Sequence, residues 1–127
     1  MRRILLAVPA IIVAAWFALG IRQAHDLAAA TALVDSVKHL TAADARRANA
    51  LLDSAGQLNP DRQVQIMRAR VVLDTGDREL AERILAPVVR SEPQNADAWF
   101  WVAQAAPNPA EFFNALRHVG QLIAKIR

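Results

Sequence analysis

The chain has 127 residues, enough for one small domain with an additional segment, and 54% of them are hydrophobic. The formal net charge is +3, but without Arg2 and Arg3 the 15 basic residues fall to 13, interspersed with 12 acidic ones, which argues against a nucleic-acid-binding surface. The absence of cysteine excludes disulfides, thiol catalysis and thiolate metal sites.

The first feature along the chain is an uncharged apolar run over residues 4–21. Its 18 residues approach the roughly 20 that a helix needs to cross a bilayer. Arg2 and Arg3 precede the run, and Trp16 lies near its far end, where an indole suits the membrane interface. We therefore predict a signal-anchor over residues 1–21. It makes a single pass through the cytoplasmic membrane, with a cytoplasmic N-terminus and an extracytoplasmic C-terminal domain.

Two alternatives to the anchor are a cleavable signal peptide and a buried helix of a soluble domain. A signal peptide usually has a shorter apolar core of roughly 7–15 residues. Near the end of the run, only the stretch from Ala18 to Gly20 offers a cleavage site, and it is a poor one. Cleavage there would give a mature N-terminus near Ile21. The retained anchor is the interpretation that we favour.

Residues 22–127 carry helical signals throughout. Thr41 with Asp44 forms a capping pattern, and Asn59–Pro60 and Asn108–Pro109 resemble helix starts. Gly76 followed by Asp77 indicates one helix end and the next helix start. We predict an all-α domain, with six helices over residues 22–39, 42–57, 60–74, 78–91, 95–106 and 109–126. We expect the first to continue the apolar run without a break, although Gly20 offers a hinge.

Residues of one kind recur with a period of 33 or 34. Small residues stand at 36, 69 and 103 and again at 48, 81 and 115. Larger apolar residues show the same spacing at 52, 85 and 119. This period with two helices per unit is typical of a solenoid of helical hairpins, in which small residues let helices approach closely.

The sequence resembles the tetratricopeptide repeat (TPR) family over roughly residues 28–126. The residues that match the family spacing are Ala69, Gly76, Ala81, Leu85, Pro93, Trp99 and Ala103. It departs from the pattern at Gln65, at Val72 and at the "PNPA" break of residues 107–110. The resemblance implies three repeat units, at about 28–58, 61–92 and 95–126. The predicted fold class is therefore all-α: an N-terminal transmembrane helix followed by a short TPR-like solenoid over residues 22–127.

In this family the first helices of successive repeats line a groove that holds a peptide. By register, the resemblance implies a partner groove made of Val37, Gln63, Ile66, Arg70, Phe100 and Gln104. Arg70 offers a bidentate fork to a carboxylate, and Phe100 offers an apolar floor. Alternatively, Arg70 is an ordinary solvated residue that pairs with Asp74 one turn later.

Two further aromatic residues are candidates for an interface. The resemblance places Trp99 against the second helix of its repeat, whereas Trp101 is expected to point outward. On the last helix, an apolar stripe about 120° wide begins at Phe112. Phe113 lies off that stripe, so we expect it to be exposed. The last helix is either the cap of the solenoid or a surface for a homodimer or a partner.

Nothing in the sequence indicates an enzyme. The histidines at 25, 39 and 118 lack metal-ligand spacing, and no serine lies in a nucleophile-elbow context. No glycine-rich phosphate loop occurs. The acidic residues at 74, 77, 79 and 82 surround a helix start, where they favour capping. We predict no catalytic, metal or cofactor-binding residue.

We therefore expect a non-enzymatic scaffold or adaptor for protein–protein interaction. It would be held in the membrane through residues 4–21 and would bind another protein or peptide segment, not nucleic acid. By analogy with other small membrane-tethered repeat proteins, it would serve an envelope assembly or export system. The alternative is a small structural subunit packed into a larger membrane complex, without a ligand groove.

Overall fold

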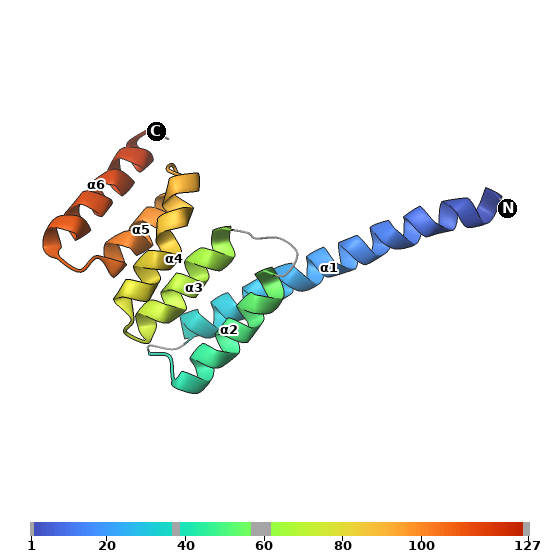
Figure 1. Ribbon diagram of the computed structural model, residues 1–127, viewed down its shortest axis with the longest axis horizontal. Coiled ribbons are helices and arrows are strands. Elements are labelled where there is room, and N and C mark those ends of the chain that lie inside the picture. The colour runs from blue at the N-terminus through green and yellow to red at the C-terminus, as the bar shows by residue number, and fades with distance from the viewer. Residues whose placement is uncertain (1, 37–38, 57–61, 126–127) are drawn as a thin grey trace.

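A computed structural model describes residues 2–36, 39–56 and 62–125, with the side chains of the first helix from residue 11 onward (Figure 1). The described residues form six α-helices, which confirms the all-α prediction. The helices are α1 (Arg2–Ser36), α2 (Ala42–Gly56), α3 (Arg62–Asp74), α4 (Arg78–Ser91), α5 (Ala96–Ala105) and α6 (Pro109–Ala124).

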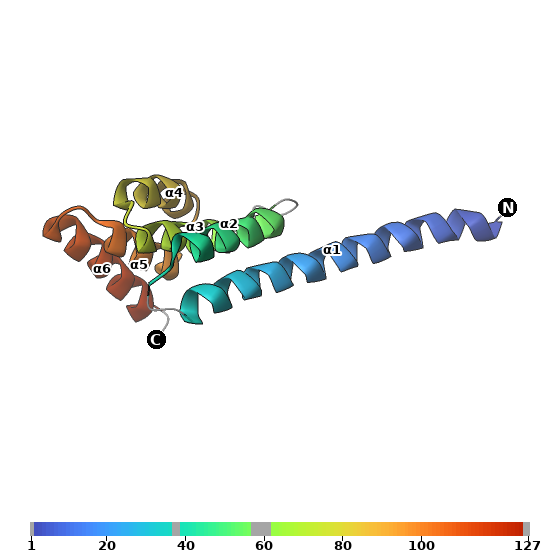
Figure 2. The same cartoon turned by 90° about the horizontal axis from the view of Figure 1, so that it is seen from below.

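Consecutive helices pack as three hairpins, α1 with α2, α3 with α4 and α5 with α6. The hairpins follow one another side by side, and the N-terminal part of α1 projects far beyond them (Figures 1 and 2). Helix α3 is central, since it contacts α1, α2, α4 and α5. The first helices of the hairpins, α1, α3 and α5, therefore lie next to one another along one side of the body.

The predicted caps set several helix ends. The Thr41 hydroxyl accepts a hydrogen bond from the Asp44 N–H at 3.2 Å, and the Asp44 carboxylate accepts one from the Thr41 N–H at 3.2 Å. The Asn108 side chain accepts from the Glu111 N–H at 3.0 Å, and Pro109 is the first residue of α6. The predicted helix start at Asn59–Pro60 lies outside the described residues.

The turn between α3 and α4 has the predicted glycine in a left-handed conformation. Gly76 has a φ of +93°, which residues with a Cβ adopt at a cost. Asp77 follows as the N-cap of α4, and its side chain accepts a hydrogen bond from the Leu80 N–H at 3.0 Å. Because the chain reverses within these few residues, α3 and α4 lie side by side and pack on each other.

Two apolar cores lie on opposite sides of α3. Val64, Met67 and Val71 face a core shared with α1 and α2, whereas Ile66 and Ala69 face a core shared with α4 and α5. The alanines that recur with the repeat period are all buried, which lets the helices approach closely, but Ser36 is exposed. Helix α3 thus contributes side chains to both cores and joins the three hairpins into one body.

The N-terminal segment differs from the prediction. Helix α1 is continuous from Arg2 through Gly20 to Ser36, as we expected for this part of the chain. Nowhere in the described residues, however, does a helix have a stretch that is both long enough and apolar enough to span a bilayer. In the described part of α1, the apolar run gives way to Arg22, His25 and Asp26 within the same helix. The transmembrane helix over residues 4–21, and the single-pass membrane location inferred from it, are therefore wrong.

Candidate functional site

The inner face of the body, which we define as the side formed by α1, α3 and α5, carries most of the predicted groove. Gln63 and Gln104 are exposed, Phe100 is 39% exposed, and Arg70 is half-buried. Ile66 is only 1% exposed and belongs to the second core, so it is inaccessible to a ligand. Val37 lies outside the described residues.

Arg70 connects all three helices of the inner face. Its Nη2 lies 2.5 Å from Oδ1 of Asp35 on α1, and its Cζ lies 5.2 Å from the ring centroid of Trp101 on α5. Its ion-pair partner is thus Asp35, and not Asp74 as the alternative interpretation had it. A guanidinium has five N–H donors, so one carboxylate leaves donors for a second acceptor. Arg70 is both a brace between helices and a candidate ligand contact.

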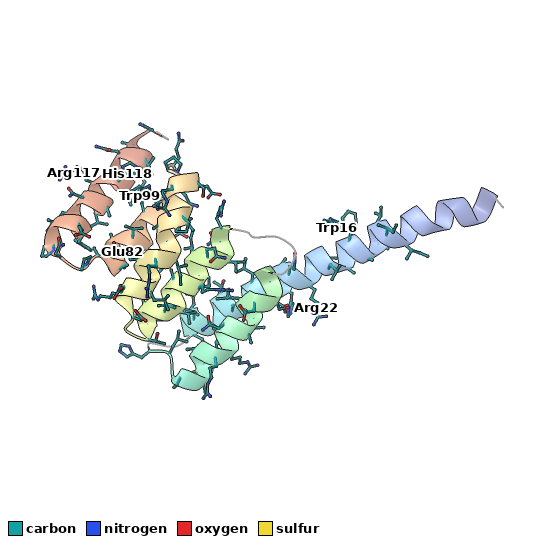
Figure 3. All side chains as sticks on the ribbon, viewed as in Figure 1. Trp16, Arg22, Glu82, Trp99, Arg117 and His118 are labelled. Carbon is teal, nitrogen blue, oxygen red and sulfur yellow. The ribbon has the colours of Figure 1, made fainter. Side chains whose placement is uncertain are left out.

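The three consecutive aromatic residues of α5 have three different environments. Trp99 packs on α6, where its ring centroid lies 4.3 Å from that of His118, and its indole N–H donates to the Pro93 carbonyl at 3.0 Å (Figure 3). Trp101 is half-buried beside the second core and Arg70, and does not point outward as expected. Phe100 lies edge-on to Trp101 with centroids 5.2 Å apart and remains the accessible ring.

Polar contacts between the first helices complete the inner face. The Gln63 amide on α3 donates to the Asp97 carboxylate on α5 over 3.4 Å. Asp35 and Asp97 were not predicted as site residues, yet each contacts a residue of the predicted groove. For Asp97 the signal is the repeat period: Gln63 and Asp97 are 34 residues apart, which places them at equivalent positions on neighbouring first helices. Asp35 had no such signal.

A hollow lies where α5 ends and α6 begins. It has a volume of about 440 Å³, and its lining includes Arg78, Pro107, Phe112 and Phe113. Arg78 donates to the carbonyls of Gln104 and Ala106 at 3.3 Å, so its charge satisfies the C-terminal end of α5. Phe113 is 62% exposed, as the last-helix pattern predicted. The role of Arg78 had no signal in the sequence, because it depends on how two separate helix ends meet.

Comparison with known proteins adds no identification: no family model, no curated protein and no solved structure matches the chain significantly. Within the described residues, no three histidine, aspartate or glutamate side chains gather in a way that would hold a metal ion. The relation to the tetratricopeptide repeats therefore stays a prediction, based on the residues and the period alone.

Proposed function

We propose that this chain is a non-enzymatic helical-repeat adaptor that binds a segment of another protein on its inner face. The observation that carries the proposal is the cluster of Phe100, Trp101, Arg70 and Asp35, which joins three neighbouring helices around one exposed aromatic ring. Its likeness to tetratricopeptide repeats, in which this side of the solenoid holds peptides, supports the same assignment.

The chemistry of the cluster suits an extended peptide with one apolar side chain beside an acceptor group. Phe100 supplies apolar surface, and an aromatic ring held against a second ring loses little conformational freedom on binding. The Arg70 guanidinium and the exposed Gln104 amide supply donors for carbonyl or carboxylate oxygens. A ligand carboxylate at Arg70 would share the guanidinium with Asp35 or displace it.

The test is a purification of partners with the native chain and with Phe100→Ala, followed by titration of the identified partner segment. Phe113→Ala is the matched control, since it removes an exposed phenyl from a different surface. We expect the Phe100→Ala variant to weaken binding by at least about tenfold and Phe113→Ala to leave it unchanged. Arg70 is a poorer first target, because its removal also breaks contacts between helices.

The outcomes separate the proposal from its alternative. Equal binding by the native chain and Phe100→Ala would exclude the inner face as the binding site. If the partner is then lost only when exposed residues of α1 are changed, the chain is a packed subunit of a larger assembly. Melting curves of both variants check that the fold is retained; both rings are accessible, so we expect small changes.

A further inference from the structure

The N-terminal half of α1 exposes large apolar side chains that the rest of the chain leaves uncovered. Trp16 is 69% exposed and projects from the helix well away from the body (Figure 3). The other large apolar residues between 11 and 21 that are strongly exposed are Ile11, Ile12, Val13, Phe17, Leu19 and Ile21. A helix with this much apolar surface is usually buried against other helices.

Three of these exposed residues lie on the same side of α1 as the residues that pack against α2, and together they form one stripe along the helix. Ile12, Trp16, Leu19, Gln23, Asp26 and Ala30 follow one another at alternating steps of four and three residues. This spacing is the heptad pattern by which helices pack lengthwise on each other. Ala30 is fully buried in the core shared with α2, and Asp26 accepts a hydrogen bond from Ser54 of α2 at 2.6 Å. The stripe is covered at its C-terminal end and uncovered from Leu19 to Ile12.

We propose that the uncovered stripe of Ile12, Trp16 and Leu19 binds the same stripe of a second copy of this chain. Each copy carries the stripe, so the contact is self-complementary, as a twofold interface requires. No charged residue lies between residues 11 and 21, so like charges do not oppose the contact within this stretch. The proposal does not depend on the inner face, which lies on the body.

The apolar surface of the stripe is that of a small interface, which suits a weak dimer. The seven exposed side chains present on the order of 700 Å² of apolar surface, of which the three residues of the stripe supply about half, against the roughly 800 Å² that each partner contributes to a standard interface. A pair of helices covers only part of this surface, so we expect dissociation in the micromolar range.

The first experiment is sedimentation of the full chain over a concentration series around 10 µM, compared with Trp16→Glu and Ala18→Glu. Ala18 is exposed and lies about 200° around the helix from Trp16, so its variant adds the same charge on the opposite side. We expect the native chain and Ala18→Glu to be dimers at the upper concentrations. The dissociation constant of the Trp16→Glu dimer should be about a hundredfold higher, because in a symmetric dimer the substitution changes both sides of the contact.

A cross-linking experiment locates the contact directly. Because the chain has no cysteine, single variants Ile12→Cys, Trp16→Cys and Leu19→Cys each report only on their own position. At least one should form a disulfide-linked dimer much faster than Ala18→Cys under the same oxidant. All three should do so if the helices are parallel, and only the one nearest the twofold axis if they are antiparallel.

Several results would overturn the proposal. A native chain that stays monomeric throughout the series would do so, as would a dimer that persists in Trp16→Glu or is lost equally in Ala18→Glu. Monomers that co-sediment with vesicles of phosphatidylcholine and phosphatidylglycerol would show that lipid covers the stripe instead. Far-UV circular dichroism shows whether each variant is folded; Trp16 is far from both cores, so we expect no loss of the body.

Discussion

The two halves of α1 are similar in composition and opposite in environment. Residues 11–21 and residues 27–34 are both rich in alanine and branched aliphatic side chains. In the second half, Ala30 and Val34 are buried against α2 and α3, whereas in the first half Trp16 and Phe17 are about two-thirds exposed. Apolar composition thus shows that a segment needs to be covered, but it does not show what covers it.

The lengths of α1 and α2 explain why only the C-terminal half of α1 is covered by other helices. Helix α2 has 15 residues and α1 has 35. At 1.5 Å per residue, α2 is about 22 Å long, so an antiparallel partner of this length covers less than half of α1. The next hairpin contacts α1 and α2 only through α3. The exposed half of α1 therefore follows from the difference in length between two consecutive helices.

The largest contrast is expected between a core residue and the most exposed ring. Leu52 on α2 is fully buried against α1 and α3, so Leu52→Ala should lower the free energy of unfolding by about 2–5 kcal/mol. Trp16→Ala removes a larger side chain, yet it should change the value for the monomer by less than about 0.5 kcal/mol. Urea denaturation in dilute solution measures both, and a large loss in Trp16→Ala would contradict the comparison.

A smaller contrast is expected between two glycines. Gly76→Ala should lower the free energy of unfolding by about 1–2 kcal/mol. Nothing lies within 4 Å of the added methyl group, so the loss comes from the φ of +93°, which is strained for alanine. Gly20→Ala should instead increase the helix signal at 222 nm, because alanine favours a helix interior by up to about 1 kcal/mol. Its effect on the melting temperature of the body should be small. A destabilised Gly20→Ala variant would show that this half of α1 is already packed.

The smallest effect concerns the ion pair that joins the covered half of α1 to α3. Arg70→Met should lower the free energy of unfolding by about 1 kcal/mol. The ion pair contributes little, because the Asp35 side chain is half exposed and water weakens the attraction, and the contact of Arg70 with Trp101 contributes the rest. Arg83→Met, which breaks an exposed pair with Glu79 at 3.8 Å, is the control and should cost about 0.3 kcal/mol. Thermal unfolding at low and high salt compares them; equal losses would show that Arg70 does not brace the inner face.

The predictable features of this chain are those set by neighbouring residues. Caps at Thr41, Asp77 and Asn108 and the turn at Gly76 placed the helix ends correctly, because each depends on hydrogen bonds or backbone angles within a few positions. The features that failed depend on distant parts of the chain. Register alone placed Ile66 on the inner face, whereas α3 turns that side chain into the second core.

The candidate site divides in the same way. Phe100 was correctly expected to be accessible, since the helical period separates it from its two tryptophan neighbours. The contact of Arg70 with Asp35 requires α1 to lie against α3, and local spacing favoured Asp74 instead. The membrane assignment failed on another ground. The continuity of α1 was expected, but no helix among the described residues has a stretch that is long and apolar enough to span a bilayer.

The unbroken course of α1 fixes distance and angle as well as contact. About 20 residues of rigid helix separate its N-terminal end from the body, a span of roughly 30 Å, and each residue added to it turns the far end by about 100°. The helix therefore fixes orientation as well as distance. A partner that binds the stripe at Trp16 also sets the direction in which the inner face points. A flexible linker of the same length would transmit the reach but not the orientation.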